Sequence, residues 1–597
     1  MYQQPKTTRC SNTFLDSARQ DADDYGDALA ADIFSSPAIT ASGRLGYNKL
    51  VSLADTLESD PELMIIPGST LATDMAAFPE ELRNYYAPMP APDWVDEGKL
   101  ETAAIFWENN SLAMLGVLYA ASLPACYLMK NGIPALYQTE KLRDQKYIFQ
   151  RIYETGIMLE GVMKPGGLRV VQDVQPDISC FVEAALHKLD PQAKWKLTGQ
   201  TAAPSPGLNA ARTFTKAEMH AAILEAQAEA KKQPGRFIWG SGYVQAKKVR
   251  LLHSSMRYML MYPDKVHPRG TAGAPASLSE KLSQRPPTQP WPSEKLGKPV
   301  NQEDLAFTLL TFGYLIPKGM ESWGCRLSDA EKEAFLHLWR VVGHVMGLRE
   351  DLMTDNWEEG GDLYNAILQR QGGTSEAGIA LTDAVMGFLR SYLPEAFHLR
   401  EYIPVVLIAD LMGENTKDLL APKDIERLNS VYGQFLQTAL HFSLKLYYRY
   451  YQRVLEAFPF SQRLFGNMFS DASEALIASW RDEFRREPFF IPADATSWQL
   501  RRGADEEFSA TLQAWRVEVL MAIVMPILWL GLSGVAGIVG IVGMFLHSDP
   551  VAWSGLAAFI LLILNAFYGM DTRLPKICAA RPESQGIRLN PGKTEKS

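Results

Sequence analysis

Hydrophobic positions along this chain recur mostly with helical spacing. Apolar side chains return every three or four residues in segments 142–163, 329–348, 375–393, 403–412 and 423–458, and strand-like alternation is almost absent. Ser328-x-x-Glu331 is a capping-box pattern that predicts the start of the second of these helices, and Pro165-Gly166-Gly167 predicts the end of the first. The pattern therefore predicts a mostly α fold, with one large helical domain over residues 46–516.

Three stretches interrupt or precede this pattern. Residues 1–45 are polar and rich in small side chains, and we expect them to form a flexible N-terminal arm. Residues 101–129 are apolar around a few polar positions, which favours one or two buried helices, broken near Pro124, that serve as a core or pocket element. Residues 263–300 carry many prolines with Gly and Ser between them, and this composition is typical of an irregular insertion such as a lid or a surface wrap.

The C-terminal part has a different hydrophobic pattern. Segments 519–546 and 551–570 contain no charged side chain, and each is long enough to cross the roughly 30 Å hydrocarbon core of a bilayer. We expect two transmembrane helices over 517–570, joined by a short turn and packed closely through glycines: Gly531, Gly534, Gly537, Gly540 and Gly543. The alternative is a hydrophobic hairpin buried in a soluble protein.

Basic residues follow the second apolar run, in a tail that spans residues 571–597. The positive-inside rule then predicts that the hairpin enters from the cytoplasm and returns to it. We therefore expect a multi-pass membrane protein whose helical domain faces the cytoplasm. The lysines and arginines of the tail that carry this argument are Arg573, Lys576, Arg581, Arg588, Lys593 and Lys596.

The candidate chemistry lies in the helical segment 249–262. Arg250, His253 and Arg257 follow one another at spacings of three and four residues, which puts them on one face of an otherwise apolar helix. A buried imidazole can ligate a haem iron, and a guanidinium can pair with a haem propionate. The other interpretation is that the histidine is a hydrogen-bonded core residue and that the arginines pair with acidic side chains.

Three short motifs give the chain a resemblance to a known family. Arg250-x-x-His253-x-x-x-Arg257 resembles the haem-ligand motif of the latex-clearing rubber oxygenases, whose wider family includes the ER-bound oxygenase of the mycophenolic acid pathway. Arg151-Ile-Tyr-Glu-Thr155 is similar to the family's upstream distal motif. Pro299-Val-Asn-Gln-Glu-Asp304 and Trp339-Arg-Val-Val-Gly343 resemble its downstream half. The likeness runs from about residue 103 to residue 352.

The resemblance implies a helical haem-binding domain with globin-like packing and haem b as the cofactor. His253 would be the metal ligand. Arg250 and Arg257 would bind the cofactor's propionates or orient the ligand helix. The expected reaction is O2-dependent oxidation or cleavage of a C=C bond in an apolar, isoprenoid-like or lipid-like substrate.

The distal motif assigns three candidate catalytic residues. Arg151 and Thr155 lie one helical turn apart and would face the open iron position, where a guanidinium and a hydroxyl can polarise bound oxygen. The latex-clearing enzymes carry a lysine just before the motif threonine, but this chain has Glu154. That carboxylate is either a base for allylic proton removal or a surface residue, so a lysine-capped closed state is not expected here.

Composition narrows the class of protein further. The net charge of −9 argues against nucleic acid as a partner, since phosphate binding needs a basic face. The five cysteines are scattered, without zinc-site spacing, which favours a reducing compartment. The N-terminal residues lack the apolar stretch of a secretory signal, so we expect the helical domain to stay inside the cell, unlike the exported latex-clearing enzymes.

Two other functions remain open from the sequence. A non-enzymatic, membrane-anchored helical protein that binds lipid or a partner would lack haem, and a visible absorption spectrum would distinguish it. A haem protein with peroxidase or hydroxylase chemistry would differ in the mass of its product. Among the other histidines, only His344 lies in a context comparable with that of His253.

Overall fold

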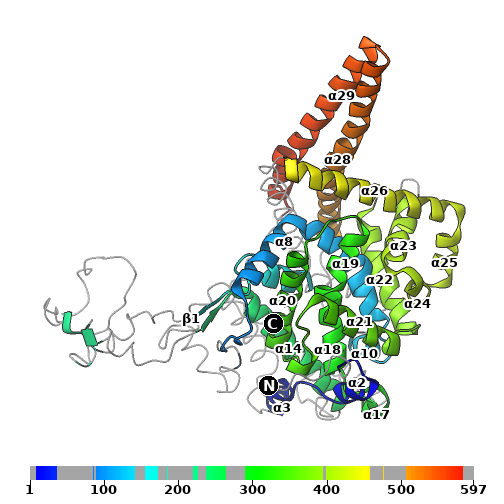
Figure 1. Ribbon diagram of the computed structural model, residues 1–597. Helices are drawn as coiled ribbons and strands as arrows, with labels where there is room; N and C mark the ends of the chain where they lie inside the picture. The colour runs from blue at the N-terminus through cyan, green and yellow to red at the C-terminus, as the bar shows by residue number, and fades with distance from the viewer. Residues whose placement is uncertain are drawn as a thin grey trace.

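The chain forms a helical body from which a long helical hairpin projects (Figure 1). The computed structural model describes residues 9–35, 85, 89–140, 155–172, 185, 188, 220–222, 224–225, 237–263, 290–393, 398–457, 475 and 506–582. Within these ranges the only strands are a short antiparallel pair, β1 with β2, in which Val171 is opposite Ile238. The predicted mostly α fold is therefore confirmed, while globin-like packing stays a prediction.

The elements follow one another along the chain in a nearly all-helical order. They are α2 (Asn12–Arg19), α3 (Asp24–Ser35), α8 (Glu97–Val117), the π-helix η2 (Leu118–Ser122), α9 (Leu123–Tyr127), α10 (Ile133–Glu140), β1 (Val170–Gln172), β2 (Phe237–Trp239), α14 (Ser241–Met261), α17 (Ser293–Leu296), α18 (Gln302–Gly313), α19 (Leu315–Ser322), α20 (Asp329–Val345), the 3-10 helix η3 (Glu350–Leu352), α21 (Trp357–Gln371), α22 (Glu376–Tyr392), α23 (Leu399–Met412), the 3-10 helix η5 (Gly413–Asn415), α24 (Thr416–Leu419), α25 (Pro422–Asn429), α26 (Val431–Ala457), α28 (Glu506–Phe545), α29 (Asp549–Tyr568), the π-helix η7 (Gly569–Arg573) and α30 (Leu574–Ala579).

Helix α18 runs through the middle of the body. Asn301 caps it by accepting a hydrogen bond from the backbone N–H of Asp304, and nearly all of its side chains are buried. It packs against α20 and α21, and the ring of Phe312 stacks on that of Trp339 at 4.6 Å. Helix α20 begins with the predicted Ser328–Glu331 capping box.

The segment 97–127 is one nearly continuous buried helix, as its apolar composition predicts. A single π-helical turn, η2, separates α8 from α9 directly before Pro124. Because proline lacks an N–H and crowds the preceding turn, it disturbs the regular α-helical hydrogen bonds there. The helix is therefore distorted near Pro124, where the sequence predicted a break, but it continues into α9, which forms a wall of the cavity described below.

Residues 9–35, the described part of the N-terminal segment, form packed helices where the sequence suggested a flexible arm over residues 1–45. Helices α2 and α3 pack on the body, and Leu15 and Ala18 are fully buried. The polar side chains that suggested a loose arm are buried as well: Arg19 and Asp23 are at most 7% exposed. Each of them pairs with an opposite charge, which makes its burial possible. Those partners lie outside the N-terminal segment, so the sequence of this segment alone does not reveal them.

Helix α14 starts directly after β2 and lies against the helical residues 155–163. A side chain at Gly242 would meet the carbonyl oxygen of Gly161 at 2.6 Å, so the two backbones touch at this crossing. The 155–163 helix ends before Gly166, whose φ of +75° is suited to glycine, as the Pro-Gly-Gly sequence predicts. Most of the predicted 263–300 insertion lies outside the described residues.

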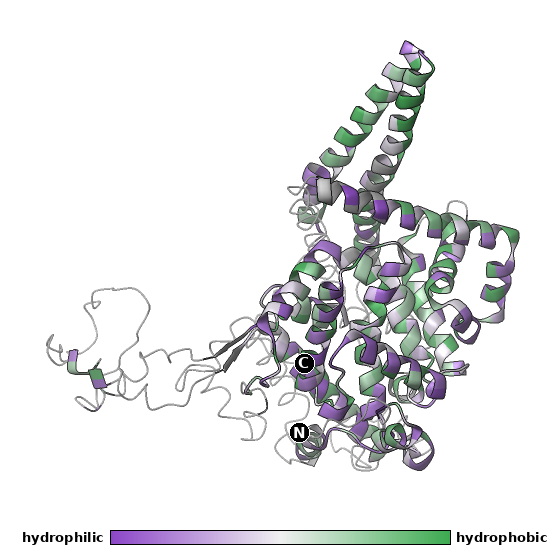
Figure 2. Cartoon of the chain, viewed as in Figure 1, coloured by the Kyte–Doolittle hydropathy of each residue, from purple (hydrophilic) through white to green (hydrophobic). Residues whose placement is uncertain are grey.

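The hairpin consists of α28 and α29, packed along each other through glycines. A side chain at Gly555 would meet the backbone of Gly540 at 2.4 Å, and Gly537 and Gly543 also face α29. The expected close packing is confirmed for these positions, whereas Gly534 faces open space. Hydrophobic residues cover the outer surface of the hairpin (Figure 2).

The hairpin does not begin where the sequence suggested. Helix α28 runs without interruption across the expected boundary between residues 516 and 517. Its first part belongs to the body, because Trp515, Val519 and Ile523 are buried in the core, and Trp515 donates a hydrogen bond to the carbonyl of Ile577. Among the described residues, one helix, Asp549–Ala579, is long and apolar enough to cross a membrane, and Leu532–Phe545 is a shorter apolar stretch.

Candidate functional site

A cavity of about 240 Å³ lies in the body, where five helices meet. Its walls come from α9, α10, α14, α18 and the helical residues 155–163, with Met346 beyond the end of α20. The lining is mostly Leu, Met, Ile, Val and Phe, so the cavity offers an apolar surface. The polar or ionisable side chains in the lining are few: Cys126, Tyr127, Thr155, His253, Asp304 and Thr308.

His253 is placed on the wall of this cavity by α14. Leu252 and Met256 flank it on the same wall. Of the described histidines only His253 lines the cavity, whereas His344 packs its ring edge-on against Trp94 at 5.9 Å. Of the two histidines that the sequence did not distinguish, His253 therefore lies at the cavity and His344 does not.

Thr155 brings the distal motif to the same cavity. It is the first residue of the described helical stretch 155–163, and it lines the cavity together with His253. Arg151 and Glu154, the other two candidate catalytic residues, lie outside the described residues. One of the three distal candidates is thus found beside the candidate ligand.

Arg250 is bound to an acidic residue of the N-terminal segment. Its Nε and Nη2 atoms donate to both carboxylate oxygens of Asp23 at 2.6 and 2.7 Å, and its Nη1 donates to the carbonyl oxygen of Val345 at 3.1 Å. Burial lowers the pKa of Arg250, but the bidentate pair with Asp23 outweighs this, so the pKa is raised overall. With each of its guanidinium nitrogens donating inside the protein, Arg250 is arranged to orient α14 rather than to hold a propionate.

Arg257 makes a similar pair about two helical turns further along. Its Nη1 donates to Asp27 at 2.9 Å and its Nη2 donates to the carbonyl oxygen of Val300 at 2.9 Å. Val300 lines the cavity and has a φ of +50°, which is unfavourable for a β-branched residue. Backbone strain of this kind collects at functional sites, and here the Arg257 hydrogen bond helps to hold it. Of the two sequence interpretations for the arginines, the structure favours pairing with acids.

The motif 299–304 ties the N-terminal segment to α18 beside the cavity. Arg19 donates to Glu303 and Asp304, both at 3.0 Å, and Arg370 donates to Glu303 at 2.6 Å. Burial raises the pKa of Asp304, and Arg19 opposes this effect. Gln302 adds hydrogen bonds to the carbonyl oxygens of residues 22 and 347. This motif is therefore a structural junction whose last residue, Asp304, reaches the cavity wall.

The glycines of the Gly343-x-x-x-Gly347 pattern also serve packing. A side chain at Gly343 would meet Leu309 of α18 at 3.0 Å, and one at Gly347 would meet the guanidinium of Arg250 at 2.8 Å. These two glycines therefore allow a neighbouring helix and the Arg250 pair to approach the C-terminal end of α20.

The donor set fits haem better than a bare metal ion. Within the described ranges no group of three or more His, Cys, Asp or Glu side chains is arranged to hold a metal ion. One imidazole on an apolar wall is too few ligands for a free cation, but a haem iron needs only one protein ligand on its proximal side. Burial raises the pKa of the Cys126 thiol, so a thiolate ligand is disfavoured in the same cavity.

Sequence reasoning missed the acidic partners of the motif arginines. Asp23 and Asp27 are four residues apart, so they lie on one face of the chain leading into α3, opposite two arginines seven residues apart on α14. The pair of acidic residues four positions apart was the available signal. It was overlooked because the two segments are separated by more than two hundred residues.

Comparisons with known proteins address the same part of the chain. Residues 239–438 match the family model "ER-bound oxygenase mpaB/B'/Rubber oxygenase, catalytic domain". A rubber oxygenase from Streptomyces sp. (strain K30) is 25% identical over 150 residues, which span 25% of this chain and 31% of that protein. A structure of latex clearing protein LCP in the closed state aligns with 72% of this chain and 84% of its own, with a TM-score of 0.42 and 16% identity.

The matched region includes His253 with both motif arginines, and it starts downstream of Thr155. It overlaps the resemblance seen in the sequence and extends it to residue 438. Residues 239–438 are thus similar to the catalytic domain of the ER-bound oxygenases mpaB/B' and rubber oxygenases.

Proposed function

We propose that this protein is a membrane-anchored, haem b-dependent oxygenase that oxidises or cleaves a C=C bond in an apolar, isoprenoid-like or lipid-like substrate. The observation that carries the proposal is the apolar cavity whose wall contains both His253 and Thr155. These residues come from two separate motifs of one oxygenase family, and they are about a hundred positions apart in the sequence. When bound, haem b supplies the iron at which dioxygen reacts.

We assign each residue of the site a role that follows from its position. His253 would hold the haem iron, and the Asp23–Arg250 and Asp27–Arg257 pairs fix the helix that carries this histidine. The leucine and methionine side chains of the cavity receive the apolar substrate and exclude water.

The distal motif supplies the hydrogen-bond donors proposed for the oxygen chemistry. The hydroxyl of Thr155 would serve as such a donor in the cavity, and we assign Arg151 the same role by its motif. Glu154 is the candidate base for allylic proton removal, and a surface position is the alternative. The three roles rest on the motif, and for Thr155 also on its place in the cavity wall.

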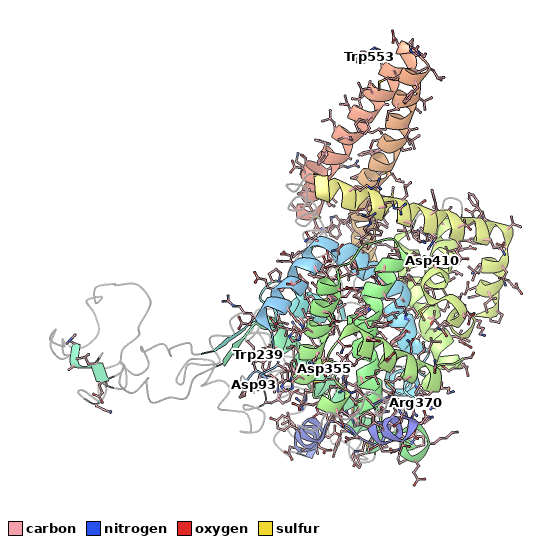
Figure 3. The ribbon with its side chains drawn as sticks, viewed as in Figure 1. Asp93, Trp239, Asp355, Arg370, Asp410 and Trp553 are labelled. Carbon is pink, nitrogen blue, oxygen red and sulfur yellow. The ribbon has the colours of Figure 1, made fainter. Side chains whose placement is uncertain are left out.

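Membrane anchoring is proposed from the hairpin. Exposed apolar side chains cover α28 and α29 from Leu528 to Leu564, and α29 spans about 30 Å at 1.5 Å per residue. Trp553 lies at the tip, far from the body (Figure 3), where an interfacial tryptophan is favourable. Arg573 and Lys576 lie at the foot, which supports two spans with the body on the cytoplasmic side.

Haem content tests the cofactor. The purified full-length protein is expected to show a Soret band, and His253→Ala is expected to lose it while keeping its helical circular dichroism spectrum. His344→Ala is the matched control and is expected to keep haem. A wild-type protein without haem would favour a non-enzymatic lipid- or partner-binding protein. Product mass after reaction with O2 and an isoprenoid-like substrate then separates cleavage from hydroxylation or peroxidase chemistry.

Topology can be tested at the two ends of the hairpin. In sealed vesicles with the cytoplasmic face outward, a membrane-impermeant maleimide is expected to label Cys578 at the foot. Trp553→Cys at the tip is expected to react only after permeabilisation. Equal labelling of both positions before permeabilisation would contradict a hairpin that crosses the bilayer.

A further inference from the structure

Helix α26 exposes a stripe of large apolar side chains to solvent. Val431, Phe435, Phe442 and Leu446 are 88%, 64%, 66% and 53% exposed. Their spacings of four, seven and four residues return to the same face of a helix. The stripe thus runs along much of a helix that is roughly 40 Å long, since each of its residues adds about 1.5 Å.

The opposite face of α26 packs on the body. Gly433 and Tyr448 are buried, Leu444 packs on the core, and the imidazole of His441 lies 2.9 Å from the carboxylate of Asp410 on α23. These positions are rotated by about 110–170° from the centre of the stripe on a helix of 3.6 residues per turn. The apolar stripe therefore faces away from the body.

The location of α26 in the fold relates the stripe to the hairpin. The helix lies crosswise at the foot of the α28–α29 hairpin, with α23 and the rest of the body on its other side (Figure 1). Its stripe lies on the face turned away from α23 and the core. A bilayer crossed by the hairpin would have its near surface along α26.

The charges at the end of the helix suit the same surface. Lys445, Arg449 and Arg453 are exposed, and Arg449 and Arg453 continue the line of the apolar stripe toward the C-terminal end of α26. An apolar stripe bordered by basic side chains is the composition of a helix that lies in the interface of an anionic membrane.

We infer that α26 is a membrane-interface helix whose Val431–Phe435–Phe442–Leu446 stripe inserts into the surface of an anionic lipid bilayer. It is a second contact with the membrane besides the hairpin, and together the two fix the orientation of the body on the bilayer. The inference rests on the membrane anchoring proposed above, but not on haem or on the reaction.

The test uses the full-length protein in nanodiscs of phosphatidylcholine and phosphatidylglycerol, at one copy per disc. Hydroxyl-radical footprinting with peptide mass spectrometry measures how fast each side chain is oxidised, relative to its intrinsic reactivity. Phe435, Phe442 and Leu446 are expected to be oxidised several-fold more slowly than Tyr25 and Ile105, which are 51% and 50% exposed elsewhere on the body.

Leu561, which is 65% exposed on α29, separates the possible outcomes. Protection of the stripe and of Leu561 is the expected result. Protection of Leu561 with an oxidised stripe would overturn the inference and leave the hairpin anchor standing. Oxidation of both would overturn the anchor as well. Protection of the stripe only in discs that hold two copies would assign the stripe to self-association, against the inference.

A pair of adjacent substitutions provides a control within the helix. Phe442→Asp puts a charge on the stripe, whereas Ser443→Asp puts the same charge at the next exposed position, off the stripe. The first is expected to raise the oxidation of Phe435 several-fold in nanodiscs, and the second is expected to leave it unchanged. Equal effects of the two variants would contradict insertion of this face. Helical circular dichroism checks that both variants are folded.

Discussion

The pair between Asp23 and Arg250 offers the sharpest test of how the ligand helix is held. Asp23→Asn keeps the size of the side chain and removes its charge, which leaves the guanidinium of Arg250 without its counter-ion. The two side chains are only 8% and 10% exposed, so solvent screens this loss very little. The hydrogen bond from Arg250 to Val345 remains, but it does not neutralise charge.

The magnitude follows from these contacts. Two short charge-assisted hydrogen bonds are weakened at once, and breaking a buried ion pair by removing one partner costs about 3–5 kcal/mol of unfolding free energy. Asp27→Asn is the matched control. Arg257 is only 3% exposed, but Asp27 is 31% exposed and accepts from a single nitrogen, so we expect a smaller loss of about 1–3 kcal/mol.

A double-mutant cycle with Arg250→Met separates the pair from other effects. Urea unfolding in detergent micelles, followed by tryptophan fluorescence, gives the unfolding free energy of each variant. The coupling energy between Asp23→Asn and Arg250→Met is expected to be about 2–3 kcal/mol, because the double variant leaves no unpaired buried charge. The folded Asp23→Asn protein is expected to bind haem more weakly than the wild-type protein, as measured by the Soret band during a haem titration. Additive effects of the two substitutions, or unchanged stability in Asp23→Asn, would refute this account.

Three further predictions concern the cavity, pH and packing. Thr155→Val keeps the shape of the side chain and removes its hydroxyl, so haem content is expected to stay while single-turnover reaction with O2 and an isoprenoid-like substrate slows by on the order of 10²-fold; an unchanged rate would remove Thr155 from the mechanism. Burial lowers the pKa of His337 to about 4, where its Nε2 accepts a backbone hydrogen bond, so the folded state binds fewer protons than the unfolded state between pH 4 and 6.5. Stability is therefore expected to fall as pH drops through this window, by up to about 3 kcal/mol, and His337→Gln should flatten the fall in urea-unfolding measurements at each pH. Gly347→Ala places a methyl group against the Arg250 guanidinium at a φ of +84° and is expected to lower the unfolding free energy by about 2–3 kcal/mol, whereas Gly166→Ala, at a φ of +75° in open space, should cost about 1 kcal/mol; equal losses would mean that the contact with Arg250 carries no weight.

The sequence was most informative where structure depends on near neighbours. Helical periodicity, the capping box at Ser328 and the glycine after the 155–163 helix are local signals, and the structure has each of them. The ligand helix was also predictable, because the spacing of Arg250, His253 and Arg257 on one face is a property of that segment alone. Glycine spacing likewise predicted the close approach of the hairpin helices at Gly540.

Tertiary structure decided what each of these local features contacts. The sequence could not show that the arginines beside His253 pair with Asp23 and Asp27, because an ion pair between distant segments has no local pattern. For the same reason, the polar residues of the N-terminal segment suggested exposure, although their partners bury them.

Long-range packing also decided where the hairpin begins and which residues line the cavity. Apolar composition locates α28, but only the packing of Trp515 and Ile523 assigns its first part to the body. The cavity depends on five helices meeting, so the sequence identified His253 and Thr155 separately while the fold brought them to one cavity. Local spacing thus determined the faces of the helices, and long-range packing determined what lies opposite each face.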